Sequence, residues 1–159
     1  EILRNFNSET HNIAVLFPKV TNVFYWYDKI TQMGYNCSKF TSKDDEIGII
    51  ENIHITTFKS AKGLEFDTVI IPDFNEYQVN IQNNDNVSEN DYYVVFTRAR
   101  RNLFLIDNSK SSGKECNLPF MQSQLTRNIV EVDNSNSYSF FSESLQSESN
   151  DVDDDDLPF

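Results

Sequence analysis

The feature that most constrains this fold is a polar segment between two runs of apolar and β-branched residues. The first run covers residues 53–58, and the second is Val69, Ile70 and Ile71. Short runs bounded by turn residues are typical of buried strands. The segment between them contains Gly63, which lets a backbone turn or approach a ligand closely. Because ligands of open α/β sheets sit at the carboxyl ends of strands, this pattern predicts a site within residues 56–67.

Further strands and two helices are expected along the chain. Residues 12–17, 35–40 and 103–106 are predicted strands. Apolar residues recur at spacings of three and four from Thr21 to Met33, which predicts an amphipathic helix. Its buried face would hold Val23, Phe24, Trp26, Tyr27, Ile30 and Met33. The pattern indicates an α/β fold with a mainly parallel sheet flanked by helices.

Local signals mark where these helices begin and end. Thr21 or Asn22 is expected to cap the first helix, and Gly34 to lie just past its end. Residues 75–87 are rich in Asn and Gln and are predicted to be an exposed loop. Ser88 is expected to start the second helix, with Asp91 in the capping-box position. The buried side of that helix would hold Tyr92, Val95, Phe96 and Ala99.

The negative charge of the chain is concentrated at its end. The formal net charge is −12, from 25 acidic and 13 basic residues among 159. Nine of the acidic residues and none of the basic ones lie in residues 128–159, which leaves 16 against 13 in residues 1–127. The body is therefore nearly neutral, and the overall charge does not exclude a phosphate-binding surface.

Composition also bears on the location of the chain. It has no apolar run near 18 residues and no basic-plus-apolar leader, so we expect a cytoplasmic protein without a membrane span. Cys37 and Cys116 fit no metal-ligand spacing and are interpreted as reduced thiols. No metal site is predicted. The chain starts at Glu1, which suggests a piece of a longer polypeptide.

Two segments carry a resemblance to a known family. Residues 56–72, TTFKSAKGLEFDTVIIP, resemble motif V of superfamily 1 helicases of the UvrD/Rep type. Residues 92–106, YYVVFTRARRNLFLI, resemble motif VI of the same family. Their order and spacing also match, and the resemblance extends over roughly residues 12–107. It implies a RecA-like domain, the second of two motor domains of a DNA helicase.

On this interpretation the chain has four parts. Residues 1–11 are a connector, and residues 12–107 are the second RecA-like motor domain. Residues 108–132 are a linker with a short packing segment. Residues 133–159, rich in Ser, Asn and acidic residues, are predicted to be a disordered acidic tail.

The resemblance assigns nucleotide contacts to three residues. It implies that Arg98 is the catalytic arginine that reaches the γ-phosphate, and a forked, permanently charged guanidinium suits phosphate oxygens. It also implies that Glu65 approaches the nucleotide sugar and that Gly63 allows close packing there. Without the motif, Arg98 would more simply be a solvated cation at a helix end, and Glu65 an acid at a helix start.

Contacts to single-stranded DNA are implied for Thr56, Thr57 and Lys59. Hydroxyl and ammonium groups can hold phosphates without reading sequence. The threonines are also explained by strand propensity alone, and the family usually has histidine at the position of Lys59. Lys62 is either a phosphate contact or a surface charge.

The chain departs from the family at motif IV. The family has an arginine there that reaches the nucleotide, whereas Phe24 occupies the aligned position and Lys19 is the nearest cation in sequence. The chain also has no G-x-x-x-x-G-K-[ST] loop. ATP with Mg²⁺ would therefore be bound mainly by an upstream motor domain, in a cleft between the two domains.

The last residues suggest a separate role. Asp155, Asp156, Leu157, Pro158 and Phe159 end an acidic run and resemble the C-terminal tip of bacterial single-stranded DNA-binding proteins. That tip docks onto repair and replication proteins, which implies such proteins as possible partners. A solubilising acidic tail is the plainer interpretation. The tip supports an alternative function, in which a catalytically inactive helicase-like module recruits such proteins.

Overall fold

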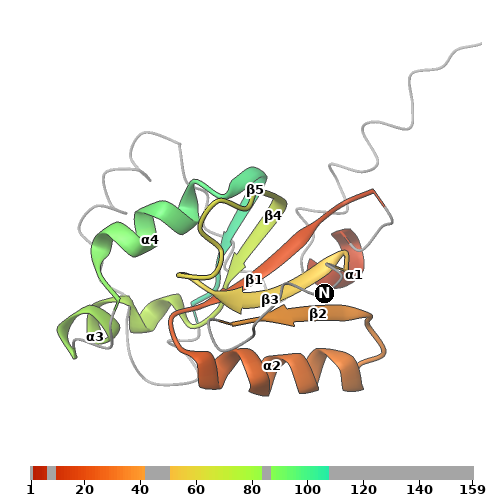
Figure 1. The fold of residues 1–159 in the computed structure, drawn as a ribbon, viewed down its shortest axis with the longest axis horizontal. Coiled ribbons are helices and arrows are strands. Elements are labelled where there is room, and N and C mark those ends of the chain that lie inside the picture. The colour runs from red at the N-terminus through yellow and green to blue at the C-terminus, as the bar shows by residue number, and fades with distance from the viewer. Residues whose placement is uncertain (1, 7–9, 42–50, 84–86, 108–159) are drawn as a thin grey trace, which may run out of the picture. The chain divides into compact units, whose positions relative to one another are not determined.

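The computed structural model describes residues 2–6, 10–41, 51–83 and 87–107, and these contain one five-stranded sheet (Figure 1). The strand order is β2-β3-β1-β4-β5, and every pairing is parallel. The strands are β1 (Ile13–Phe17), β2 (Cys37–Phe40), β3 (Ile53–Thr57), β4 (Phe66–Ile71) and β5 (Ala99–Leu105). The helices are α1 (Ile2–Phe6), α2 (Val20–Gln32), η1 (Phe74–Glu76), α3 (Tyr77–Gln82) and α4 (Glu89–Phe96). The predicted α/β fold with a parallel sheet is confirmed.

The centre of the sheet forms the core. All five residues of β1 and all five of β3 are buried, as expected for strands covered on both faces. In Figure 1, α2 lies on one side of the sheet and α4 on the other. The ring of Phe17 in β1 stacks on that of Trp26 in α2, with centroids 6.1 Å apart. Burial on both faces explains why the strands are nearly continuous apolar runs.

Helix α2 forms where the periodicity predicts it, but its details differ. Its N-cap is Lys19, without a side-chain cap, so the prediction of Thr21 or Asn22 was wrong. Gly34 follows the helix with φ of +88°, which confirms its predicted place because a left-handed backbone favours glycine. Val23 and Ile30 are buried, whereas Phe24 and Met33 are exposed. The helix therefore buries a narrower face than its apolar residues suggest.

Residues 75–87 were predicted to be an exposed loop, which is wrong for residues 75–82, while residues 84–86 lie outside the described residues. Residues 74–82 form η1 and α3 instead, and Phe74, Asn75, Tyr77 and Asn80 are buried there. Asn80 Nδ2 donates a hydrogen bond of 3.2 Å to Tyr92 Oη. The rings of Tyr77 and Tyr92 lie 4.5 Å apart. Aromatic packing against α4 thus gives an Asn-rich segment a helical, buried structure.

The start of α4 agrees with its sequence signal. Ser88 is the N-cap, its side chain accepts from the Asp91 amide, and the Asp91 carboxylate accepts from the Ser88 amide. Tyr92 and Val95 are buried as predicted, whereas Phe96 is only half-buried. Strand β5 begins at Ala99, four residues earlier than predicted, so Ala99 belongs to the strand and not to the buried side of the helix.

The predicted domain boundaries are only partly within reach of the structure. Residues 2–6, which belong to the predicted connector, form α1, and Ile2 is buried there. Residues 108–159, which include the predicted linker and acidic tail, lie outside the described residues. No helix among the described residues is long and apolar enough to cross a membrane.

Candidate nucleotide and nucleic-acid site

Residues 58–65, here called the crossing loop, connect the carboxyl end of β3 to the amino end of β4. Because β1 lies between these strands in the sheet, the loop passes over it. Two buried side chains hold the loop down: Phe58 is 1% exposed and Ala61 is fully buried. The loop therefore begins at the carboxyl ends of the parallel strands and finishes at their amino ends.

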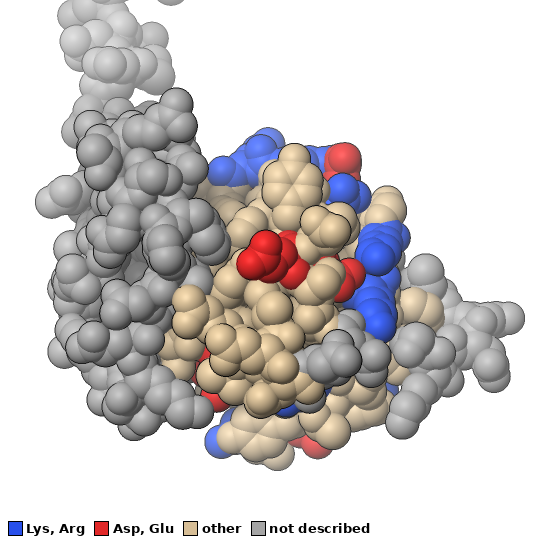
Figure 2. Space-filling model, turned by 90° about the vertical axis from the view of Figure 1, so that its left-hand side faces the viewer, with Lys and Arg blue, Asp and Glu red and all other residues tan. Residues whose placement is uncertain are grey.

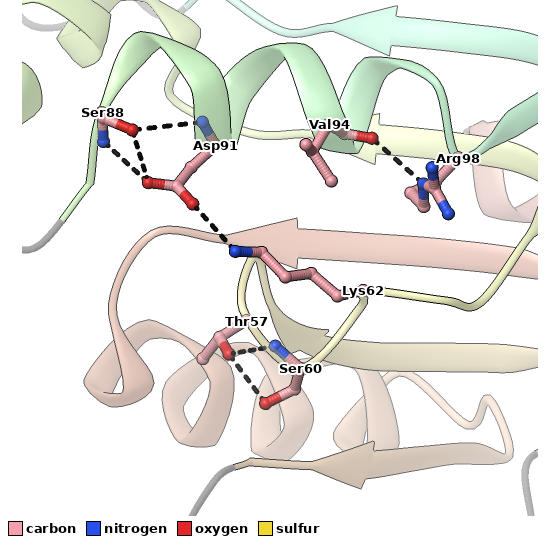
Figure 3. Close-up of polar contacts among 7 residues, drawn as sticks. All are labelled: Thr57, Ser60, Lys62, Ser88, Asp91, Val94 and Arg98. Carbon is pink, nitrogen blue, oxygen red and sulfur yellow. Dashed lines mark hydrogen bonds and ion pairs between the residues drawn. The ribbon is translucent and has the colours of Figure 1, made fainter.

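At its first end, the crossing loop is organised by hydroxyl groups. Thr57 Oγ1 donates to Ser60 Oγ at 3.0 Å and accepts from the Ser60 amide at 3.2 Å (Figure 3). Thr56 is fully buried, and its hydroxyl donates to the carbonyl oxygen of Phe40. Lys59 is exposed. Of the three predicted DNA-binding residues, Lys59 is thus the one whose side chain faces solvent, and both threonine hydroxyls already hydrogen-bond within the protein.

At its second end, the crossing loop carries the predicted nucleotide-binding residues. Gly63 has φ of +85°, and a Cβ atom built there would meet no atom within 4 Å. Glycine is favoured by this backbone conformation, and the space beside it is open. The exposed Glu65 carboxylate lies 3.0 Å from Nε of Arg100 in β5.

Arg98 joins this end of the loop from the turn between α4 and β5. Its Nε donates to the carbonyl oxygen of Val94 at 3.1 Å, and its Nη1 to that of Leu64 at 3.4 Å. Its Nη2 donates to Thr97 Oγ1 at 3.2 Å. None of the ion pairs found within the described ranges involves Arg98. Its positive charge is therefore oriented by neutral acceptors and is not neutralised by a described carboxylate.

The structure brings Gly63, Glu65 and Arg98 to the amino ends of β4 and β5, and not to the carboxyl ends of strands where a ligand site was predicted. Of the predicted residues, Thr57 and Lys59 lie at a carboxyl end, that of β3. The Phe66 amide, next to Glu65, donates to the Arg98 carbonyl oxygen at 2.9 Å. Thr57 and Lys59 are separated from them by the length of the crossing loop. The predicted residues thus form two groups, joined by one loop.

A residue in the middle of the loop, Lys62, forms an ion pair with α4 that was not predicted from the sequence. Lys62 Nζ lies 3.5 Å from Asp91 Oδ1 in the first turn of α4 (Figure 3). Burial raises the pKa of Asp91, but hydrogen bonds from Ser88 and the charge of Lys62 outweigh this effect and hold the pKa below its usual value. Lys62, which the sequence left undecided, is thus an ion-pair partner in the structure.

The departure at motif IV is visible as an exposed aromatic ring. Phe24 is 41% exposed, and Lys39 Nζ from β2 lies 5.0 Å from its ring centroid. The cation found beside Phe24 is therefore Lys39, which is distant in sequence, and this contact could not be read from local spacing.

No metal centre is found in the described part of the chain, where no three His, Cys, Asp or Glu side chains cluster suitably. Cys37 is a free cysteine. Burial raises the pKa of its thiol, the hydrogen bond with Thr31 lowers it, and the net direction is upward. A raised thiol pKa disfavours a reactive thiolate.

A profile of the UvrD-like helicase C-terminal domain matches residues 28–110, which are 83 of the 159 residues. The chain belongs to the UvrD-like helicase C-terminal domain family. The match covers the crossing loop, α4 and β5, and therefore Gly63, Glu65 and Arg98. The predicted acidic tip, Asp155 to Phe159, lies outside the matched residues and outside the described ones.

A solved structure with a similar fold was also found. The C-terminal domain of a possible DNA helicase from Lactobacillus plantarum WCFS1 matches with a TM-score of 0.50 and 19% identity. The match covers 67% of this UvrD-like chain and 62% of that structure. At this identity the likeness shows the fold alone. No curated protein sequence matches the chain.

Proposed function

We propose that this chain is the second motor domain of an ATP-dependent DNA helicase or translocase. In this proposal the domain completes an ATP site shared with an upstream motor domain and contacts single-stranded DNA. The observation that carries the proposal is Arg98, whose guanidinium is held by the carbonyl oxygens of Val94 and Leu64 within a motif VI sequence. Membership of the UvrD-like family supports it.

Arg98 has the chemistry for a γ-phosphate contact. Two carbonyl oxygens fix the guanidinium without cancelling its charge, so the group is oriented before a phosphate arrives. Such preorganised charge stabilises the negative charge that spreads over a transferring phosphoryl group. Arginines in this role contribute about 10³–10⁵-fold in rate.

Glu65 and Gly63 would hold the nucleotide sugar beside Arg98. A carboxylate can accept hydrogen bonds from ribose hydroxyls, and the open space at Gly63 lets a ligand approach the backbone. Glu65 pairs with Arg100 across exposed surface, and such pairs are weak in water. The carboxylate can therefore exchange this partner for a sugar hydroxyl at little cost.

The other end of the crossing loop would contact single-stranded DNA. Lys59 supplies an exposed cation, which suits phosphate contacts that do not read sequence. Thr57 is buried, and a phosphate would have to replace the hydrogen bonds of its hydroxyl with Ser60. Thr56 would support this end of the loop through its bond to Phe40. On the face in Figure 2, Lys and Arg side chains gather along one edge, while a smaller acidic group lies nearer the middle.

ATP chemistry would need the upstream domain. The sequence has no phosphate-binding Walker loop, and the described residues offer no cluster of metal ligands. Mg²⁺ would therefore be held by the nucleotide phosphates and the upstream domain. When bound, ATP with Mg²⁺ supplies the phosphoryl transfer that drives movement. This chain would supply Arg98 to the γ-phosphate, Glu65 to the sugar, and the DNA-contacting end of the crossing loop.

The test compares two arginines in the full-length protein. Arg98→Ala is expected to abolish DNA-stimulated ATP hydrolysis while the affinity for single-stranded DNA stays within about twofold, because Arg98 is at the far end of the loop from Lys59. Arg101→Ala is the matched control, since Arg101 is an exposed neighbour that pairs with Asp67. Wild-type turnover in Arg98→Ala would refute the proposed role. A wild-type protein without any ATPase activity would favour the non-catalytic interaction module.

A further inference from the structure

The crossing loop is joined at three points to the segment made of α4 and the turn that follows it. At the first, the Phe58 and Tyr92 rings meet edge-on with centroids 4.8 Å apart, and both residues are almost fully buried. At the second, Lys62 pairs with Asp91. At the third, the Leu64 carbonyl oxygen accepts from Arg98. The loop and helix are thus held together from the proposed DNA end to the proposed nucleotide end.

The position of the Arg98 guanidinium depends on both elements at once. Nε is bound to Val94 in the last turn of α4, and Nη1 is bound to Leu64 in the loop. A shift of the loop along the helix would change one of these bonds relative to the other. The orientation of the Arg98 guanidinium therefore depends on the position of the loop relative to α4.

The Lys62–Asp91 pair is suited to set that relationship. Asp91 cannot move freely, because it accepts from the Ser88 amide at 3.0 Å and from Ser88 Oγ at 2.8 Å. Lys62 thus binds a carboxylate that is fixed to the start of α4. Its own side chain is 56% exposed, so the pair adds little stability, and any role it has is in the position of the loop.

We propose that Lys62 and Asp91 are positioning residues that couple the DNA-contacting end of the crossing loop to Arg98. This inference rests on the proposed function. DNA bound at Lys59 would shift the loop, and the ion pair would transmit the shift to α4 and so to the guanidinium. Lys62 acts through Asp91 and does not contact DNA or nucleotide.

The experiment uses Lys62→Met, Asp91→Asn and their double variant in the full-length protein. Met keeps the aliphatic stem of Lys62, and Asn keeps an oxygen that can accept from Ser88. Each single variant is expected to lower DNA-stimulated ATPase turnover about 3–10-fold. DNA-independent turnover and the Kd for single-stranded DNA should stay within about twofold. The double variant should lose no more than either single variant, because both remove the same interaction.

Two controls define what the pair does. Lys62→Arg keeps the charge and reach and is expected to restore stimulation. Lys29→Met removes an exposed lysine of α2 and should change nothing. A loss of DNA affinity in Lys62→Met but not in Asp91→Asn would overturn the inference, because Lys62 would then be a phosphate contact. Unchanged DNA stimulation of ATPase activity in both variants would also overturn the inference. In that case the proposed function would stand, because the wild-type protein would still hydrolyse ATP in response to DNA.

A measurement without ATP keeps the test independent of the proposed function. Amide hydrogen exchange reports local opening, and the Leu64 and Arg98 amides bond to the carbonyl oxygens of Ala61 and Val95. Lys62→Met should speed exchange at both amides if the pair holds the loop on α4. Unchanged exchange at both would show that the pair does not position this end of the loop, whether or not the protein hydrolyses ATP.

Discussion

Phe58 and Tyr92 pack ring edge against ring face, and this contact joins the start of the crossing loop to α4. The centroids are 4.8 Å apart, and the residues are 1% and 2% exposed. Aromatic pairs prefer this geometry, which adds to the stabilisation from their buried area. The contact lies at the proposed DNA-contacting end of the crossing loop, beside Thr57 and Lys59, so the core of the domain also supports its site.

Phe58→Ala is therefore expected to destabilise the protein severely. Truncating a buried phenylalanine removes apolar contacts and leaves a cavity, at a cost of about 3–5 kcal/mol. Urea denaturation monitored by circular dichroism measures the change. Tyr93→Ala is the matched control, because Tyr93 lies on the same helix but is 68% exposed. A loss below about 1 kcal/mol for Phe58→Ala would contradict the packing described.

The free energy of unfolding should decrease as the pH is lowered through a window set by His54. This side chain is 1% exposed, its Nδ1 lies 2.8 Å from Ser38 Oγ, and its Nε2 has no hydrogen-bond partner in the described structure. Burial lowers its pKa from 6.5 to about 4. The unfolded chain therefore takes up a proton near pH 6.5 that the folded chain refuses until about pH 4. The stabilisation is complete above pH 6.5 and is lost as the pH falls toward 4.

The expected loss across this window is about 3 kcal/mol, since one pKa unit corresponds to about 1.4 kcal/mol. Urea unfolding at pH 7, 6, 5 and 4 measures it. His54→Gln should flatten the curve, whatever its stability at pH 7. Asp67 and Asp91 contribute at the acid end of this window. Their pKa values are lowered from 3.8, so their stabilisation begins to fall near about pH 5 and is lost mainly below pH 4, and the comparison with His54→Gln separates the histidine from them. An equally steep curve for His54→Gln would assign the loss to another group.

The sequence predicted the central strands of the sheet well because they are buried on both faces. Residues such as Ile13, Val15, Ile53 and Ile55 record that burial directly as apolar runs. Local chemistry also sufficed at Ser88, where the cap and its partner are three residues apart. These features depend on neighbours in the chain, which a sequence displays.

The sequence could not predict structure that depends on distant partners. Asn80 is of a residue type common in loops, but in the structure it is buried and donates a hydrogen bond to Tyr92. Because the sequence does not show this partner, α3 could not be predicted. At the candidate site, motif resemblance selected Gly63, Glu65 and Arg98, which the structure places at the amino ends of β4 and β5. It did not reveal that Lys62 pairs with Asp91, because no local spacing connects residues 29 positions apart.

Gly63→Ala should destabilise the protein through the backbone alone. The φ of +85° is a left-handed conformation that costs an L-residue about 1–2 kcal/mol. A Cβ atom there meets no atom within 4 Å, so no steric clash is added. Gly63→Asn should cost less, because Asn tolerates this conformation better. Thermal denaturation of both variants measures the difference. A loss in Gly63→Ala well above 2 kcal/mol would mean that the loop contacts something the backbone argument omits.

Ser88→Ala tests the cap on which Asp91 depends. Alanine removes the hydroxyl that accepts from the Asp91 amide, and loss of an N-cap costs about 1 kcal/mol. Ser88→Gly should cost only a few tenths of a kcal/mol, because glycine lets water reach the exposed amides. Urea denaturation distinguishes the two. Because Ser88 Oγ also holds the Asp91 carboxylate that pairs with Lys62, Ser88→Ala should weaken DNA stimulation of ATPase activity slightly, in the same direction as Asp91→Asn. A variant with the expected loss of stability but full stimulation would show that the backbone amide of Ser88 is enough to position Asp91.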